Sequence, residues 1–234
     1  MKIVKINTSN SIDIEFQDEH HYIKQNTTYS NFKSGSISNP YFPTVCGVGY
    51  LGVGRFATNN NCVEYVTWKD MLERCYSEKD KLDHKSYFGI SEVCNDWLDY
   101  QNFGEWYESN KYEVNERLHL DKDIKYPGNK IYSPYHCLLV PQRINMLFSN
   151  KPNKRGLPNG INISKSGNYE ASYNGKHIGT YHTLEEAYTV YSNTKKNAII
   201  TIANEYKNKI PEEVYNALLN YEVRIENDKN YVVA

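Results

Sequence analysis

Residues able to hold a metal ion or exchange a proton are concentrated between residues 117 and 149. Asp121 follows Leu118 and Leu120, whose alternation with polar neighbours is typical of a half-buried β-strand. His119 lies two residues before Asp121, so both side chains are expected on one face of that strand. Carboxylates bind divalent cations, and histidine exchanges a proton near neutral pH. This strand could therefore present a metal-binding or proton-transferring pair.

The elements around this strand form a short segment. The turn at 126–130 follows it, and residues 137–140 predict a second apolar strand. Pro141 fits the first turn of a helix that carries Asn145 and the apolar residues Ile144, Leu147 and Phe148. The predicted order is therefore strand, loop, strand and helix.

This segment resembles the ββα-metal fold of HNH nucleases, in the form common among free-standing HNH proteins of bacteriophages. The matching residues are Leu120-Asp121-Lys122-Asp123-Ile124, Gly128-Asn129-Lys130, Tyr132-Ser133-Pro134, Val140-Pro141 and Asn145. Upstream, residues 68–76 and the helix with Trp97 and Trp106 also look like what accompanies that form. The resemblance implies one divalent metal ion, Mg²⁺, on the scissile phosphate of DNA. Asp121 then fits the carboxylate ligand, and Asn145 fits the helix ligand.

The chain departs from the HNH pattern at two places. The general base is expected directly after the aspartate, where this chain has Lys122, which is normally protonated near pH 7. His119 and His136 are the candidates that could replace it. The central Asn of the motif is matched poorly, because Tyr132 occupies its place and Asn129 lies too early. Two interpretations stay open: a competent nuclease site, and a structural remnant that binds without cutting.

Each candidate residue also has a simpler interpretation. Asp121 and Asp123 could be an ordinary pair of turn carboxylates. Asn145 could hydrogen-bond locally, and His119 could be a solvated surface residue. Their joint placement on a strand–loop–strand–helix segment favours the site.

Residues 156–210 predict three short strands followed by a long helix. The Asn174-Gly175 pair is a strong hairpin signal, and Thr183 with Glu186 forms a capping box at the helix start. The strands are expected at 160–163, 168–173 and 176–181.

This C-terminal region is similar to the Apetala-type DNA-binding domain. The matching residues are Gly160, Tyr169-Glu170-Ala171, Gly175-Lys176, Gly179-Thr180-Tyr181, Thr183 and Glu185-Glu186-Ala187. The resemblance implies a sheet that enters the major groove of duplex DNA. No arginine lies on the strands, so phosphate contacts are expected to dominate, and a solvated polar sheet is the alternative. The expected DNA-binding residues are Lys154, Arg155, Lys165, Asn168, Tyr169, Lys176 and His177.

Positive charge that could attract a nucleic acid is in excess in only part of the chain. The net charge is −1, but residues 111–210 carry 15 Lys and Arg against 8 Asp and Glu, whereas residues 1–110 carry 10 against 15. A nucleic-acid partner is therefore expected between 111 and 210.

Composition excludes several protein classes. No apolar stretch is long enough to cross a membrane, and the N-terminus lacks the apolar core of a signal peptide, so a cytoplasmic protein is expected. In the phage interpretation, this is the cytoplasm of the bacterial host. The five cysteines are widely spaced without a CxxC pair, which favours reduced thiols over a zinc site.

The patterns of the N-terminal half predict structural elements and no site residues. Strands are expected at 3–6 and 12–16, a loop at 26–43, and a glycine-rich stretch at 45–54 that favours close backbone packing over a phosphate-binding loop. Two helices follow, capped by Thr67 and Asn95. Their aromatic stripes could stack bases, but helical spacing favours a core role.

Together these patterns predict an α+β protein: a β-rich module (1–64), a helical region with the HNH-like segment (65–150), an Apetala-type domain (156–210), and a C-terminal helix and tail (211–234). The helix is expected to start at Pro211. The predicted function is that of a DNA-binding protein resembling an HNH homing endonuclease. The alternative is an inactive HNH scaffold that binds as a repressor, or that binds a host protein as an inhibitor of a defence complex.

Overall fold

The computed structural model describes residues 1–83, 87–149, 153, 155–228 and 230–231. The chain is of the mixed α+β class, as expected, and forms two compact units. The first unit comprises Met1–Gly89 with Val93–Tyr107, and the second comprises Ile90–Glu92 with Glu108–Ala234. The predicted boundaries near 64 and 150 therefore fall inside these units. None of the helices that the structure describes combines the length and apolar character that a bilayer crossing requires.

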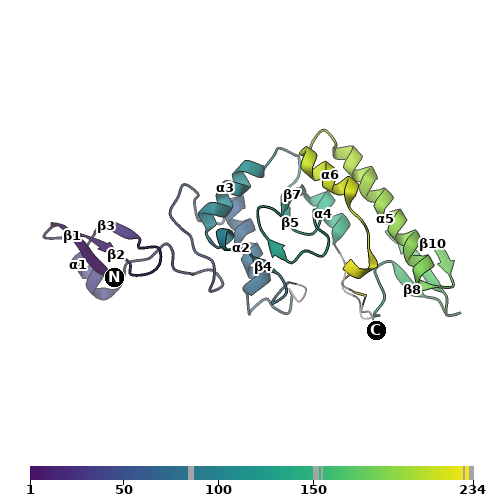
Figure 1. Ribbon diagram of the computed structural model, residues 1–234, viewed down its shortest axis with the longest axis horizontal. Helices are drawn as coiled ribbons and strands as arrows, with labels where there is room; N and C mark the ends of the chain where they lie inside the picture. The colour runs from purple at the N-terminus through teal and green to yellow at the C-terminus, as the bar shows by residue number, and fades with distance from the viewer. Residues whose placement is uncertain (84–86, 150–152, 154, 229, 232–234) are drawn as a thin grey trace. The chain divides into compact units, whose positions relative to one another are not determined.

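The first unit begins with a three-stranded antiparallel sheet (Figure 1). Its strands are β1 (Lys2–Thr8), β2 (Ser11–Glu15) and β3 (Ile23–Thr27), with β2 in the centre. Ile12, Ile14 and Phe16 form its small core. The helix α1 (Tyr29–Ser34) follows, so the prediction of an uninterrupted loop at 26–43 was wrong. The helix buries none of its residues and is started by the Thr28 cap, so no apolar period announces it.

Aromatic side chains hold the rest of the first unit together, as predicted. The helices are α2 (Val63–Tyr76) and α3 (Tyr100–Asn110), with a 3₁₀ turn η1 (Asn95–Leu98) before α3. Trp68 and Trp97 are almost fully buried, and Trp68 Nε1 donates a hydrogen bond to the carbonyl oxygen of Trp97 (2.7 Å). The predicted helix starts were wrong by about a turn. Thr67 lies inside α2 and donates to the Val63 carbonyl, and the segment after Asn95 winds as a 3₁₀ turn.

The glycine-rich stretch packs closely against these helices. A Cβ on Gly49 would meet Leu72 and Trp68, and one on Gly54 would meet Gln101. The predicted close packing is therefore confirmed at Gly49 and Gly54, whereas a Cβ on Gly47 would meet nothing within 4 Å.

The second unit contains the predicted strand–loop–strand–helix segment. The strand β5 (Leu118–Asp121) pairs antiparallel with β7 (Leu138–Pro141), and α4 (Gln142–Phe148) follows directly. Pro141 is the last residue of β7 and the N-cap of α4. Between β5 and β7, the short strand β6 (Ile131–Tyr132) pairs with β4 (Glu92–Val93). We call β5, β7 and α4 the ββα segment.

A second antiparallel sheet contains the predicted C-terminal strands. They are β8 (Ile161–Ile163), β9 (Tyr169–Tyr173) and β10 (Lys176–Tyr181), with β9 in the centre. The long helix α5 (Leu184–Tyr206) begins with the predicted capping box of Thr183 and Glu186. The helix α6 (Glu212–Asn220) and the 3₁₀ turn η2 (Ile225–Asn227) complete the unit.

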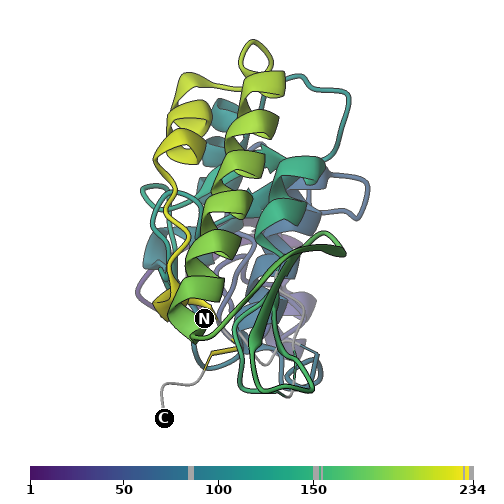
Figure 2. The ribbon, with the colours of Figure 1, turned by 90° about the vertical axis from the view of Figure 1, so that its right-hand side faces the viewer.

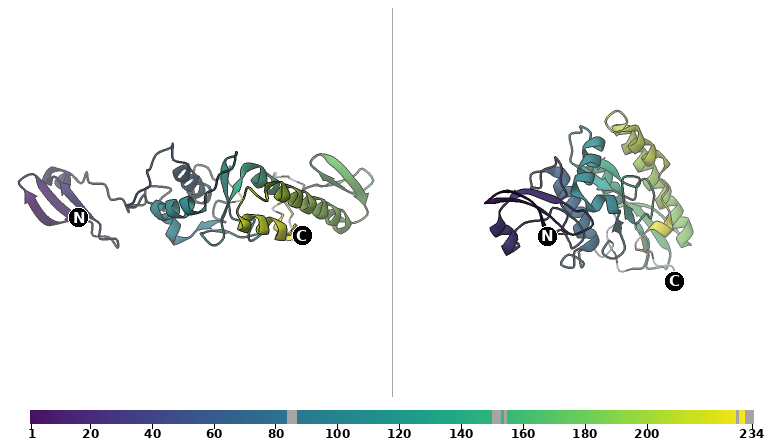
Figure 3. Two further views of the ribbon diagram at one scale, coloured as in Figure 1. Left: turned by 90° about the horizontal axis from the view of Figure 1, so that it is seen from above. Right: turned by 60° about the vertical axis from the view of Figure 1, so that its left-hand side comes forward.

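The helix α5 packs on the β8–β10 sheet and also on the ββα segment. Its first half packs on the β8–β10 sheet through Ala187, Tyr188 and Tyr191 (Figure 3, left). Its second half lies beside α4 and α6, as Figure 2 shows, and buries Ile199 and Ala203 in one core with the ββα segment. The helix α5 therefore joins the β8–β10 sheet, the ββα segment and α6 in one compact unit.

Candidate functional site

The β5–β7 register places two of the predicted site residues on one face of β5. Leu118 and Leu120 are buried, whereas His119 and Asp121 alternate with them and are half-buried. His119 lies opposite Val140, and Asp121 lies opposite Leu138. The alternation that the sequence predicted is therefore present.

The helix α4 brings Asn145 to the same place. Its neighbour Ile144 is fully buried and anchors the helix, and Asn145 Nδ2 lies 3.1 Å from His119 Nδ1. An amide nitrogen can only donate, so Nδ1 accepts and the proton of the neutral ring is on Nε2. His119 therefore fixes the orientation of the Asn145 amide.

Asp121 is a turn carboxylate with one oxygen still available. Its Oδ1 accepts the backbone N–H groups of Asp123 (2.8 Å) and Ile124 (2.7 Å), as the simpler interpretation of this residue expected. Burial, together with the charge of Asp123, raises the pKa of Asp121 to about 6. No residue that the structure describes donates a hydrogen bond to its Oδ2.

Lys122, the residue at the expected base position, is held by two acceptors. Its side chain is buried, and Nζ donates to Asp123 Oδ1 (2.7 Å) and to the carbonyl oxygen of Asn129 (2.6 Å). The Asn129 amide in turn donates to the carbonyl oxygens of Lys122 and Ile131. These hydrogen bonds hold the two ends of the loop between β5 and β6 together, and they occupy the ammonium of Lys122 with two acceptors. The sequence analysis missed this pairing, for which an Asn directly after Gly128 was the only signal.

His136 belongs to a different cluster. Its Nδ1 lies 2.7 Å from Ser133 Oγ, and its ring centroid lies 5.4 Å from that of Tyr126 and 5.1 Å from that of Tyr135. The structure therefore pairs His119 with Asn145 and places Asp121 two residues further along the same face of β5, but gives His136 other partners.

The oxygen atoms of Asp121 and Asn145 are of the kind that a hard divalent cation prefers. Among the described residues, no group of three or more His, Cys, Asp and Glu side chains could hold a metal ion. Asp121 and Asn145 nevertheless supply a carboxylate and an amide oxygen. Mg²⁺ commonly takes only one or two protein oxygens and fills its remaining positions with water or substrate phosphate.

The β8–β10 sheet distributes the predicted DNA-binding residues over two faces. Residues that oppose each other across paired strands share a face. Tyr169 and Lys176 oppose Tyr181 and Tyr173 and thus share the face of the buried Ala171, which packs on α5. They do not lie on the face opposite α5, where a groove-binding sheet would need them.

The face opposite α5 is polar rather than strongly basic. Glu170 lies in its centre, between Asn162 and Thr180, and His177 opposes Ser172 on the same face. Arg155 is the cation placed there, because its guanidinium donates to Asn162 Oδ1.

The remaining predicted DNA-binding residues lie at turns or outside the described part of the chain. Lys165 is exposed in the turn between β8 and β9. Asn168 is used within the structure, since its Oδ1 lies 3.2 Å from His182 Nδ1. Lys154 lies outside the described residues.

Comparisons with protein families, with curated proteins and with solved structures found no match to this chain. The HNH and Apetala-type resemblances therefore stay predictions, and the proposals below are argued from the geometry of the described residues.

Proposed function

We propose that this protein binds duplex DNA and hydrolyses its phosphodiester backbone with a divalent metal ion held by the ββα segment. The observation that carries the proposal is the contact of Asn145 on α4 with His119 on β5, whose face also carries Asp121 two residues further along. The hydrogen bond between His119 and Asn145 spans 26 positions of sequence and lies beside an apolar core that includes Val140 and Ile144. The positive charge of residues 111–210 supports a polyanionic partner.

Each residue has a role that follows from its contacts. Asp121 and Asn145 would hold the cation through their side-chain oxygens, and His119 would fix the Asn145 amide for this role by accepting from Nδ2. Because the pKa of Asp121 is raised to about 6, its carboxylate is ionised at neutral pH and carries the negative charge that a cation ligand needs. A bound divalent cation would polarise the phosphate and lower the pKa of bound water.

A second candidate function is DNA binding without cleavage. One observation favours it: each candidate base is already engaged, Lys122 by Asp123 and Asn129, His136 by Ser133, and His119 by Asn145. A base must accept a proton from water through an available lone pair. In this function the ββα segment would contribute shape and a cation, and the chain could act as a repressor or as a ligand of a host protein.

Plasmid incubation with gel shifts separates the two candidates. The protein is incubated with supercoiled plasmid in Mg²⁺, Mn²⁺ or EDTA, and binding is measured on the same samples. Nicked or linear products that need the metal support the nuclease. Binding without products under every metal supports the second candidate, and neither binding nor products contradicts both.

A further inference from the structure

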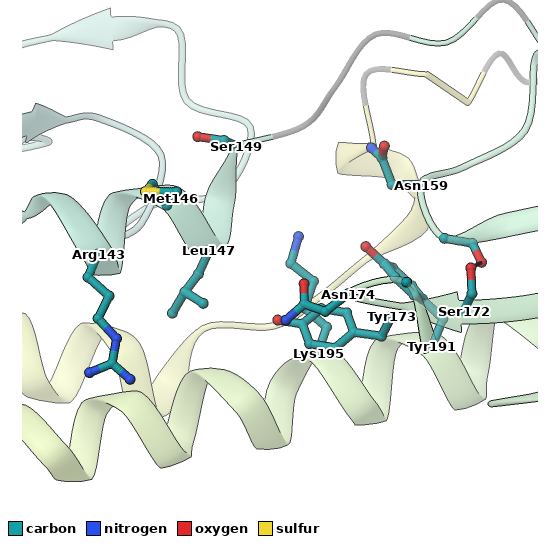
Figure 4. Close-up of a pocket in the computed structure, with 12 residues that line it drawn as sticks. Arg143, Met146, Leu147, Ser149, Asn159, Ser172, Tyr173, Asn174, Tyr191 and Lys195 are labelled. Carbon is teal, nitrogen blue, oxygen red and sulfur yellow. Dashed lines mark hydrogen bonds between the residues drawn. The ribbon is translucent and has the colours of Figure 1, made fainter. Parts of the chain in front are cut away.

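The second unit contains a pocket that does not include Asp121, His119 or Asn145, the residues of the proposed metal site. It has a volume of about 660 Å³ and lies between α4, α5 and the hairpin of β9 and β10 (Figure 4). This volume lies within the range of small-molecule sites. Its walls are formed by Met146 and Leu147 of α4, by Tyr173 and Asn174 of the hairpin, and by Tyr191 and Lys195 of α5.

Lys195 supplies a cation to this pocket, and its Nζ donates no hydrogen bond to the described residues. Lys195 is 7% exposed, and no residue that the structure describes accepts a hydrogen bond from its Nζ. Every buried side-chain nitrogen and oxygen atom in the described part of the chain has a partner, so this Nζ must be reachable from the pocket. Figure 4 shows the amine rising from α5 into the space between α4 and the hairpin.

The electrostatic environment of Lys195 favours an anion. None of the lining residues that the structure describes is acidic. Arg143 also lines the pocket, but its guanidinium is paired with Glu205 (2.5 Å), and Asp228 is the acid whose charge acts on Lys195 from outside the lining. Burial lowers the pKa of Lys195, and the charge of Asp228 offsets this effect only in part. Such a group gains free energy when an anion enters.

The other walls of the pocket suit a planar, polar group attached to that anion. The rings of Tyr173 and Tyr191 lie 6.2 Å apart in a T-shaped arrangement, beside the apolar side chains of Met146 and Leu147. Asn174, held at φ 48° in the hairpin turn, presents an amide that can both donate and accept. Aromatic rings stack nucleobases, and an amide reads their edges.

We propose that this pocket binds a nucleoside phosphate, with the phosphate on Lys195 and the base against Tyr173 and Asn174. The ligand is a free nucleotide or one nucleotide of a strand, because both present the same chemistry. None of the residues of the proposed metal site, Asp121, His119 and Asn145, lines this pocket.

The proposal is tested by calorimetric titration of the full chain with the four deoxynucleoside monophosphates, inorganic phosphate and a short single strand. Lys195→Met removes the ammonium at similar length, and Lys207→Met, at the C-terminal end of the same helix, is the matched control. We expect at least one monophosphate to bind more tightly than inorganic phosphate. Its affinity should fall about tenfold or more in Lys195→Met and stay unchanged in Lys207→Met.

Several outcomes are decisive. Preferential binding of monophosphates assigns a free nucleotide, whereas tighter binding of the single strand assigns a nucleotide within a chain. No binding by the parent, equal binding of nucleotides and inorganic phosphate, or equal binding by Lys195→Met would overturn the proposal. The melting temperature of Lys195→Met is measured alongside, and a value no lower than that of the parent shows that a loss of binding is not caused by unfolding. Asp121→Asn should bind the nucleotide normally, which separates this site from the proposed nuclease.

Discussion

Asn145 Nδ2 lies 3.1 Å from His119 Nδ1, and this hydrogen bond joins α4 to β5 at the edge of the core of the second unit. The bond orients the amide oxygen that we assign to the metal ion. It also engages the ring nitrogen that would otherwise be available to take a proton from water. One contact thus supports the metal-binding role of Asn145 and weakens the base role of His119.

Replacing Asn145 should separate metal use from DNA binding. In Asn145→Ala the amide ligand and its hydrogen bond are both lost, so metal-dependent cleavage should fall at least about tenfold. Duplex affinity, measured by gel shift in EDTA, should stay within about twofold, because the residue is one of many in the second unit. Unchanged cleavage would show that Asn145 does not hold the metal ion.

Lys122 provides a test of structural against catalytic roles. Lys122→Met leaves the Asp123 carboxylate and the Asn129 carbonyl without their buried donor, so the free energy of unfolding should fall by about 2–3 kcal/mol in urea titrations. The cleavage rate per folded molecule should change little. A variant of parental stability that has lost cleavage would instead identify Lys122 as the base.

Glu170 tests whether the sheet face opposite α5 meets DNA. Glu170 lies between Asn162 and Thr180 in the strand register, and its negative charge would repel phosphate. Glu170→Gln should raise duplex affinity about threefold at low salt if that face binds DNA. The exposed Glu185→Gln in α5 serves as the control of equal charge. Equal affinities for Glu170→Gln and the parent would place the DNA on another surface.

Stability at low pH should depend on Glu116. The hydroxyl of Tyr206 donates to its carboxylate, and this hydrogen bond lowers the pKa of Glu116 below its usual value. A lowered pKa in the folded state gives stability that is present above the unfolded value of 4.5 and is lost as the pH falls through the folded value. The free energy of unfolding of the parent should therefore fall with pH in this window more steeply than that of Glu116→Gln. Parallel curves would contradict the assignment.

Local sequence signals identified most elements of the second unit. The capping box of Thr183 and Glu186 and the Asn174-Gly175 hairpin depend only on neighbouring residues, and both are present. The division into units could not be predicted in this way. The apolar residues of α5 indicate that one face is buried, but they do not say that Ala187 meets a sheet while Ile199 meets α4 and α6.

The candidate site was predicted only in part for a similar reason. Strand alternation placed His119 and Asp121 on one face, because that rule is local. The bond to Asn145 and the burial of Lys122 against the Asn129 carbonyl arise from tertiary packing and have no short-range signature. Tyr169 and Lys176 were assigned to DNA by residue type, whereas strand register places them on the α5 side.

The most direct test of the central claim compares Asp121→Asn with the parent in nicking of supercoiled plasmid under Mg²⁺. The asparagine oxygen can still accept the N–H groups of Asp123 and Ile124, so the turn is kept while the charge that holds the cation is removed. Asp83→Ala, an exposed carboxylate of the first unit, is the control. The account predicts that Asp121→Asn loses at least about a hundredfold in rate while the control matches the parent. Nicking by Asp121→Asn at the parental rate would contradict it.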